Sequence, residues 1–332
     1  MDFKRFERVA ALSFVVALIF TSLPAGPTYD AYVVVYTDKS QYPYFRQPVR
    51  VTGQIYYQTQ AVEGGIVAVQ VDYPNKTTAI IRTVPVGLNV TFDYQLGIVS
   101  VIPSDQNGNP KTIFTRDGKA YFKVTVRNNR ITSRIALMTV SVCDIDYTPL
   151  DLVSMQASIA PESDLTFIAE TMLPPWCSTG TGKVHVSVLT DWPSSTPFGY
   201  PYCPGMSANF TITSGGAPYA CINSSEPVGG TTYNMTFRLQ PFGPLGIYDI
   251  RVGAFYKGFS CFKNTTITLV TQELGDLDFD HDIDLFDAVS IMGSYGVRSG
   301  ERFWDAAFDL SPNGKIELYD AVIVLGKYGK KY

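Results

Sequence analysis

Histidine is scarce in this chain of 332 residues, which contains only His185 and His281. The sequence also lacks a G-x-S-x-G elbow, an H-E-x-x-H pair and a glycine-rich phosphate loop, so the common catalytic motifs are missing. With a net charge of −4 and no block of Lys and Arg, no segment suits the phosphates of a nucleic acid. We therefore expect a protein that is not an enzyme and has no nucleic-acid partner. A carboxylate pair of the glycosidase type leaves no sequence motif and stays open.

Long apolar runs are also missing, except near the N-terminus. Three basic residues within the first eight precede a mostly apolar run over residues 9–20, and small residues follow by position 26. Because this run is short for a membrane span, residues 1–26 are predicted to be a secretory signal peptide, with an uncleaved membrane anchor as the alternative. Both interpretations place the remaining chain outside the cell, secreted or associated with the cell surface, with no further membrane span.

Six Asn-x-Ser/Thr sites agree with an extracellular location. Several of these asparagines are out of phase with the apolar residues of the strand-like segments around them. A glycan attached there would face solvent. The predicted glycosylation sites are Asn75, Asn89, Asn209, Asn223, Asn234 and Asn264.

Five cysteines in an exported chain indicate disulfide bonds. Four of them lie in one stretch and allow three pairings, of which we favour Cys177 with Cys203 and Cys221 with Cys261. Cys143 is then left over. No two cysteines have the spacing of two to four residues that is typical of a zinc site.

From about residue 30 to 271, apolar and polar residues alternate, and Gly, Pro and Asn turns interrupt the alternation. In PVRVTGQIYY, residues 48–57, the apolar side chains Val49, Val51 and Ile55 share one face. No segment of this region shows a sustained period of 3.6 residues. The pattern predicts a mainly β chain of antiparallel sandwiches.

Three segments divide this β region. Residues 29–90, which include YVVVYTDKSQYPYFRQPVRVTGQI, resemble the macroglobulin-type Ig-like modules of secreted prokaryotic proteins. Residues 95–213, with VIPSDQNGNPKTIFTRDGKAYFKVTVRNN, look like adhesion-type Ig-like modules of archaeal and bacterial surface proteins. Residues 214–271 are either a third short module or the completion of a neighbouring sandwich. The resemblance implies tandem Ig-like sandwiches that serve display or adhesion.

An acidic run, DLDFDHDIDLFD at residues 276–287, matches the twelve-residue EF-hand calcium loop. Carboxylates occupy positions 1, 3, 5, 9 and 12, and the residue at position 7 offers its backbone carbonyl. The predicted ligands are Asp276, Asp278, Asp280, Asp282, Asp284 and Asp287. On a β-strand the same spacing would stack like charges on one face. Position 6, which favours glycine, is His281, a residue type enriched in left-handed backbone conformations.

The acidic run has a second copy, which begins at Asp309. DLDFDHDIDLFDAVSIMGSYG, residues 276–296, aligns without gaps on DLSPNGKIELYDAVIVLGKYG, residues 309–329, with ten identities in 21 positions. The second set of predicted ligands is Asp309, Ser311, Asn313, Lys315 through its carbonyl, Glu317 and Asp320. Gly314 restores the turn residue, and both copies keep isoleucine at position 8. Two sets of oxygen ligands predict two bound Ca²⁺ ions.

One short helical pattern follows each loop, and none of comparable quality precedes it. This duplicated half-EF-hand, within residues 272–332, resembles a type I dockerin domain. The resemblance implies two calcium ions, antiparallel helices with pseudo-twofold symmetry, and docking onto a cohesin module or a similar surface protein. The residues that it implies in the contact are Leu285, Phe286, Leu318 and Tyr319. Their apolar character also allows burial against the preceding sandwich.

Two alternatives to a docking protein stay open. In one, the chain is a structural surface or filament subunit whose calcium module is an intramolecular cap. In the other, it binds carbohydrate through the aromatic loop TDWPSSTPFGYPYCPG at residues 190–205. That loop can also be a rigid segment that is tied by Cys203 and packed on Trp176.

Overall fold

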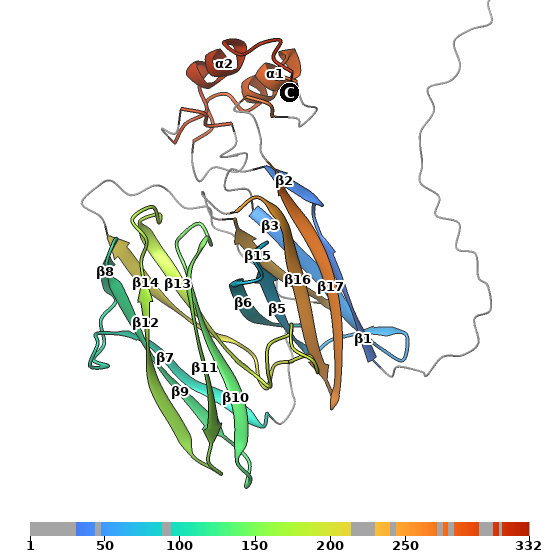
Figure 1. Ribbon diagram of the computed structural model, residues 1–332, viewed down its shortest axis with the longest axis vertical. Helices are drawn as coiled ribbons and strands as arrows, with labels where there is room; N and C mark the ends of the chain where they lie inside the picture. Colours follow the sequence, from blue (N-terminus) through green and yellow to red (C-terminus); the bar gives the residue numbers. More distant parts are fainter. Residues whose placement is uncertain are drawn as a thin grey trace, which may run out of the picture.

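The computed structural model describes residues 31–43, 48–87, 94–213, 230–239, 244–270, 275–277, 282–298, 308–311 and 314–331. The chain is mainly β, as predicted: two bodies of β-sheet lie side by side, with a small helical unit beyond one end of them (Figure 1). No helix among the described residues is long and apolar enough to cross a membrane. The predicted signal segment, residues 1–26, lies outside the described residues.

The first sandwich uses strands from both ends of the β region. One sheet has the order β1-β3-β15, with β4 also paired to β3, and the other has the order β2-β17-β16-β5-β6. The strands are β1 (Ala31–Thr37), β2 (Gln41–Pro43), β3 (Pro48–Tyr57), β4 (Gln60–Val62), β5 (Ile66–Asp72), β6 (Thr78–Pro85), β15 (Thr232–Arg238), β16 (Gly246–Tyr256) and β17 (Phe259–Val270). Strand β15 pairs with β3 and β16 with β5, both antiparallel. The strands described after residue 230 therefore belong to the same sandwich as the strands of residues 31–85.

The second sandwich is inserted between these two halves. One sheet has the order β11-β10-β13-β14-β8, and the facing sheet has the order β12-β9-β7. The strands are β7 (Leu96–Ser104), β8 (Ile113–Thr115), β9 (Lys119–Asn128), β10 (Arg134–Cys143), β11 (Pro149–Ile159), β12 (Asp164–Met172), β13 (Gly180–Leu189) and β14 (Met206–Thr213). They occupy the segment 95–213 from end to end.

The alternation of apolar and polar residues along the strands determines which side chains are buried in the two cores. In β3, Val49, Val51 and Ile55 are fully buried, because successive side chains of a strand point to opposite faces. In β9, Phe122 and Val124 are buried in the second core in the same way. Each core therefore lies between the two sheets of its own sandwich.

Strands β5, β6, β10 and β13 are buried on both faces, which the sequence alternation does not predict. Their second face belongs to the contact between the two sandwiches, where β6 lies against β10 and β13. Ser141 Oγ donates to the carbonyl of Ile81 at 2.8 Å, and Ser187 Oγ accepts from the amide of Thr83 at 3.0 Å. The outer edge of β6, which would otherwise be open to pairing with another chain, is thus satisfied within the protein.

The loop at residues 190–205 extends this contact and uses its aromatic rings there. Tyr200 stacks on Phe255 of β16 with ring centroids 5.4 Å apart, and Phe198 stacks on Phe262 of β17 at 5.5 Å. Trp192 packs against the small apolar cluster between the sandwiches. These three rings are thus packed within the protein and do not form an exposed aromatic platform, while Cys203 and Tyr202 at the end of the loop belong to the core cluster of the second sandwich together with Trp176.

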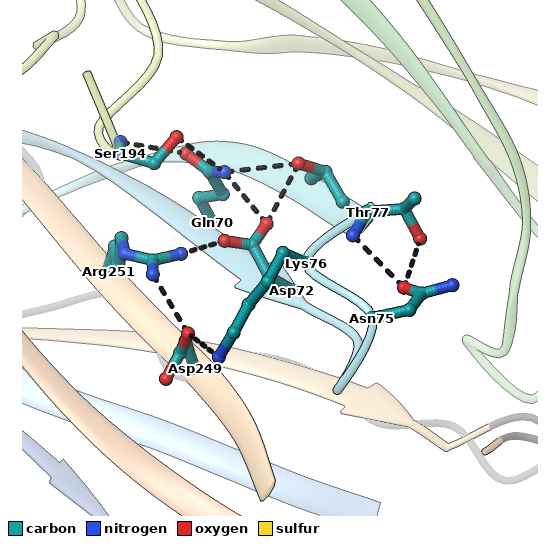
Figure 2. Close-up of polar contacts among 9 residues, drawn as sticks. Gln70, Asp72, Asn75, Lys76, Thr77, Ser194, Asp249 and Arg251 are labelled. Carbon is teal, nitrogen blue, oxygen red and sulfur yellow. Dashed lines mark hydrogen bonds and ion pairs between the residues drawn. The ribbon is translucent and has the colours of Figure 1, made fainter.

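Backbone contacts show how tightly this loop sits on the first sandwich. A Cβ atom at Gly253 of β16 would lie 2.1 Å from the carbonyl oxygen of Gly199, so only glycine permits the approach. Gln70 of β5 also meets Ser194 of the loop: Nε2 donates to Ser194 Oγ at 3.1 Å and Oε1 accepts from the Ser194 amide at 3.2 Å (Figure 2). The loop therefore joins the two sandwiches.

The predicted disulfide between Cys177 and Cys203 is wrong, since both thiols are free and buried. Cys177 precedes β13, whereas Tyr202, next to Cys203, donates its amide to the carbonyl of Val188 at the other end of that strand. The ten residues of β13 at about 3.3 Å each separate the two sites by far more than the roughly 7 Å that a disulfide spans. Cys261 is also buried with a free thiol, and Cys221, its predicted partner, lies outside the described residues.

Candidate functional site: the duplicated C-terminal loops

Two short helices follow the two predicted calcium loops, at α1 (Leu285–Gly293) and α2 (Leu318–Leu325). Asp284 caps α1, because its Oδ1 accepts from the amide of Phe286 at 2.6 Å. Asp287 reaches back, and its Oδ2 accepts from the amide of Asp284 at 2.8 Å. This reciprocal capping fixes the last four positions of the loop relative to the helix.

The carboxylates at position 12 of both loops are fully buried. Asp287 Oδ1 accepts from the amide of Leu277 at 2.5 Å, across the loop. In the second loop, Asp320 Oδ1 accepts from the amide and the hydroxyl of Ser311 at 2.8 and 2.7 Å, and Oδ2 accepts from the amide of Glu317 at 2.7 Å. Each loop is thus closed onto its own helix by a carboxylate.

The start of the second loop is also held by its first predicted ligand. Asp309 Oδ2 accepts from the amide of Gly314 at 2.8 Å. Gly314 has a φ of 80°, the left-handed conformation that glycine adopts without strain. The glycine expected at position 6 therefore makes the sharp turn that brings the loop back toward Asp309.

The isoleucines at position 8 join the two repeats crosswise. Ile283 of the first loop donates its amide to Lys330 O at 2.9 Å and accepts from Gly329 at 2.7 Å, beyond α2. Ile316 of the second loop donates to Val297 O at 2.9 Å and accepts from the amide of Gly296 at 2.8 Å, beyond α1. The two pairings thus join equivalent positions of the two repeats. Both isoleucines are fully buried in the small core of this unit.

The other predicted ligands are only partly placed. Asp276 is buried, whereas Asp278, Asp280, His281 and Asn313 lie outside the described residues. Within the described ranges, no group of three or more His, Cys, Asp or Glu residues is arranged to hold a metal ion. The donors that the sequence supplies are carboxylate, hydroxyl, amide and carbonyl oxygens, the set that a hard cation such as Ca²⁺ prefers.

The side chains at position 7 of both loops form ion pairs, and their backbone carbonyls are the atoms predicted to bind calcium. Asp282 pairs with Lys331 at 3.2 Å, and Lys315 pairs with Glu317 at 3.4 Å. The ammonium group of Lys315 thus lies beside Glu317, which is a predicted calcium ligand. Asp282 and Lys331 also form a bridge between the first loop and the C-terminal end of the second repeat.

The two helices carry a large apolar face that points into solvent. Leu285 and Phe286 are 59% and 69% exposed, and Leu318 and Tyr319 are 59% and 62% exposed. Six more residues of the two repeats are exposed, the least of them Met292 at 48%. We call these ten residues the C-terminal apolar face: Leu285, Phe286, Val289, Met292, Tyr295, Leu318, Tyr319, Val322, Leu325 and Tyr328. Each member of the first five has its counterpart at the equivalent position of the second repeat.

Sequence reasoning identified four of these ten residues and missed the others. Val289, Met292 and Tyr295 follow Leu285 at helical spacing and could have been found from that spacing in the sequence. The same helical spacing places Ala288 and Ile291 on the buried side of α1. A helix that is apolar on both sides normally packs on both sides. Within the described residues, the second side has no cover.

A second cluster of carboxylates lies in the first sandwich, and it does not resemble an acid–base pair. Arg251 of β16 pairs with both Asp72 and Asp249, the latter at 2.8 Å, and Lys76 pairs with Asp249 at 2.8 Å (Figure 2). Gln70 also donates to Asp72 at 2.8 Å. Each carboxylate has a cationic partner, so this network ties β5 to β16.

Four predicted glycosylation sites are described. Asn75, Asn209 and Asn264 are exposed. Asn75 Oδ1 accepts from the amide of Thr77 at 3.1 Å and from its hydroxyl at 2.7 Å, which leaves the amide nitrogen outside this turn (Figure 2). Asn234 is half-buried in β15, with a buried Oδ1. Asn89 and Asn223 lie outside the described residues.

No family model matches this chain, and no curated protein matches it. Among solved structures, the C-terminal domain of wzt is 11% identical, with 40% of this chain and 83% of that one covered and a TM-score of 0.31. The DNA glycosylase AlkC from Pseudomonas fluorescens is 9% identical, with 36% and 30% covered and a TM-score of 0.28. A β-glucosidase from Listeria innocua is 12% identical, with 37% and 16% covered and a TM-score of 0.26. The chain thus spans less than a third of the glycosylase and of the glucosidase, and likenesses this weak assign no function.

Proposed function

We propose that this chain is an exported, glycosylated, non-catalytic surface protein that attaches to a partner protein through its C-terminal unit. In this proposal, residues 272–332 form a dockerin-like module with two Ca²⁺ ions, and two Ig-like sandwiches, one inserted in the other, display it at the cell surface. The observation that carries the proposal is the C-terminal apolar face. It is exposed, and the same five positions of both repeats build it.

The size of this face fits a protein partner. Ten large side chains, each roughly half exposed, present about 800–1,000 Å² of accessible surface, close to the roughly 800 Å² that each side of a stable interface buries. Within each repeat the five residues follow one another at helical spacing and present about half of this area, a patch size that on monomeric proteins often has a binding role. Three Tyr, one Phe and one Met are among the ten residues, and these residue types are enriched in the centres of interfaces. A cohesin-like partner would need a similarly apolar surface.

The exposure also separates this proposal from the intramolecular cap. A cap would bury Leu285, Phe286, Leu318 and Tyr319 against the preceding sandwich, and these side chains are more than half exposed. The described residues therefore favour a partner from outside the chain.

Calcium has a structural role in this proposal. Asp276 and Asp287 are buried in the first loop and Asp320 in the second, and a divalent cation in each loop would offset the repulsion among the carboxylates of that loop. The oxygens of both loops would hold the ions. The first loop would use Asp276, Asp278, Asp280, the carbonyl of Asp282, Asp284 and Asp287, and the second Asp309, Ser311, Asn313, the carbonyl of Lys315, Glu317 and Asp320. Because both helices start at these loops, calcium would fix their orientation.

A binding experiment tests this proposal. The full chain, immobilised, is exposed to surface proteins of its source in calcium and in chelator, beside a Phe286→Asp/Tyr319→Asp variant and a Tyr121→Asp control in β9. We expect one protein to bind the wild type and the control in calcium, and to bind neither the double variant nor the chelated chain. Equal capture by the double variant would contradict a role for the apolar face. Equal capture in chelator would contradict the role of calcium.

A further inference from the structure

A second exposed face of different chemistry lies on the outer side of the sheet β1-β3-β15. The strand register aligns three rows of outward side chains across this sheet. We call them the tyrosine–amide face: Tyr32 and Tyr56; then Val34, Gln54 and Thr232; then Tyr36, Thr52 and Asn234. The alternate residues Val33, Val35 and Val51 are buried in the core, which fixes the outward direction of the rows.

Two tyrosines of this face expose much of their rings. Tyr36 is 61% exposed and Tyr32 is 43% exposed. Tyr32 stacks on Tyr56, with ring centroids 4.8 Å apart and an interplanar angle of 2°. Four residues at about 3.3 Å each place Tyr36 about 13 Å from Tyr32 along the strand. The rings thus lie at the two ends of an elongated surface.

The amide between the rings is held in position. Tyr56 OH donates to Gln54 Oε1 at 2.7 Å, and Gln54 Nε2 donates to Thr231 Oγ1 at 2.9 Å. A glutamine amide has two donor hydrogens and two acceptor lone pairs, so one of each is left for a ligand. A fixed polar group costs less entropy on binding than a mobile one.

The composition of the face selects the class of ligand. None of its eight side chains is charged, and the one cation beside them on β3 is Arg50, at the next outward position after Thr52. The face itself therefore offers no charge to a phosphate, a sulfate or an acidic peptide. Val34 is its only aliphatic residue, in contrast to the C-terminal apolar face, so it offers little to an apolar protein surface. Exposed aromatic rings beside amide and hydroxyl groups suit a molecule with apolar C–H faces and many hydroxyls.

From these observations we infer that the tyrosine–amide face binds a neutral oligosaccharide, with sugar rings over Tyr36 and Tyr32 and hydroxyls on Gln54. This site does not depend on the C-terminal unit. It also differs from the loop at 190–205, whose rings Tyr200 and Phe198 are stacked on the first sandwich.

Affinity electrophoresis of the full chain tests this inference. Soluble β-glucan, mannan, galactan and xylan are cast separately into native gels. The wild type is compared with Tyr36→Ala, Tyr36→Phe and Gln54→Ala, and with Tyr121→Ala on β9 as a control outside the face. We expect at least one polysaccharide to retard the wild type, Tyr36→Phe and Tyr121→Ala. Tyr36→Ala and Gln54→Ala should bind it at least tenfold more weakly.

Other results would overturn the inference. These are no retardation by any of the four polysaccharides, or retardation that Tyr36→Ala leaves unchanged. Tyr36 is largely exposed, so its variants should keep the melting temperature of the wild type. Should Tyr36→Ala fail to fold, the comparison of Gln54→Ala with the wild type decides. Capture of a protein by this face, with no polysaccharide bound, would also count against it.

Discussion

Replacing Asp320 by alanine should unfold the C-terminal unit and spare the two sandwiches. The substitution removes the acceptor of two backbone amides, those of Ser311 and Glu317, and of the Ser311 hydroxyl. An amide that loses its acceptor at a partly buried site costs about 1–2 kcal/mol, so the two together cost about 2–4 kcal/mol. A core as small as that of this unit supplies roughly 3–5 kcal/mol. The loss is therefore close to the whole stability of the unit.

Hydrogen exchange of the full chain, followed by mass spectrometry, measures this effect segment by segment. In Asp320→Ala, we expect amides of α1 and α2 to lose protection, while those of β10 and β13 keep it. Asp320→Asn retains one oxygen acceptor and should keep more of the protection. Asp164→Ala, at an exposed surface ion pair, is the control. Unchanged protection of α2 in Asp320→Ala, corresponding to a loss below about 0.5 kcal/mol, would refute the reasoning.

Three further predictions concern the sandwiches. Ser141→Ala removes two hydrogen bonds to the edge of β6 and should lower the free energy of unfolding in urea by about 2–3 kcal/mol. Ser154→Ala, at an exposed position of β11, should change it by less than about 0.5 kcal/mol. Burial, with Arg82 and Lys183 nearby, holds the pKa of His185 well below its usual value, so below about pH 6.5 the unfolded chain binds a proton that the folded chain does not. The free energy of unfolding should fall by about 1 kcal/mol as the pH drops from 6.5 to 5.5, and His185→Gln should flatten this dependence. An equal slope in the variant would contradict the prediction. Peptide mass spectrometry of the secreted protein should find glycans at the exposed sites and none at Asn234, and full occupancy of Asn234 would be the contrary result; the exposed sites are Asn75, Asn209 and Asn264.

The strands could be predicted from the sequence, but their partners could not. Alternation is a local property, and it identified Val49, Val51 and Ile55 of β3 because that strand has one side toward its own core. It gave no information on which distant strands pair. The sequence therefore could not distinguish a third module at residues 214–271 from the completion of a neighbouring sandwich. It does not predict the second buried face of β10 and β13, because polar residues such as Ser141, His185 and Ser187 lie on that face. The favoured pairing of Cys177 with Cys203 failed for the same reason, since closeness in sequence does not measure distance along a strand.

In the C-terminal unit, the sequence identified equivalent positions that are far apart in the chain, but it did not predict which apolar side chains are exposed. The duplication in the sequence identifies equivalent positions of the two repeats, and the crosswise pairing of Ile283 and Ile316 follows the same correspondence. The exposure of Leu285 and Phe286 could not be predicted, because an apolar residue on a helix suits a core and an interface equally well. Only the positions of the sandwiches relative to the helices distinguish the two, and those depend on contacts throughout the chain.

Calcium titration of the full chain by isothermal calorimetry, after treatment with chelator, tests the central claim most directly. The account predicts two Ca²⁺ ions per chain for the wild type, and a single ion under the same conditions for Asp320→Asn, because the second loop loses a carboxylate at position 12. An absence of binding heat in the wild type, or two ions bound with unchanged affinity by Asp320→Asn, would contradict it.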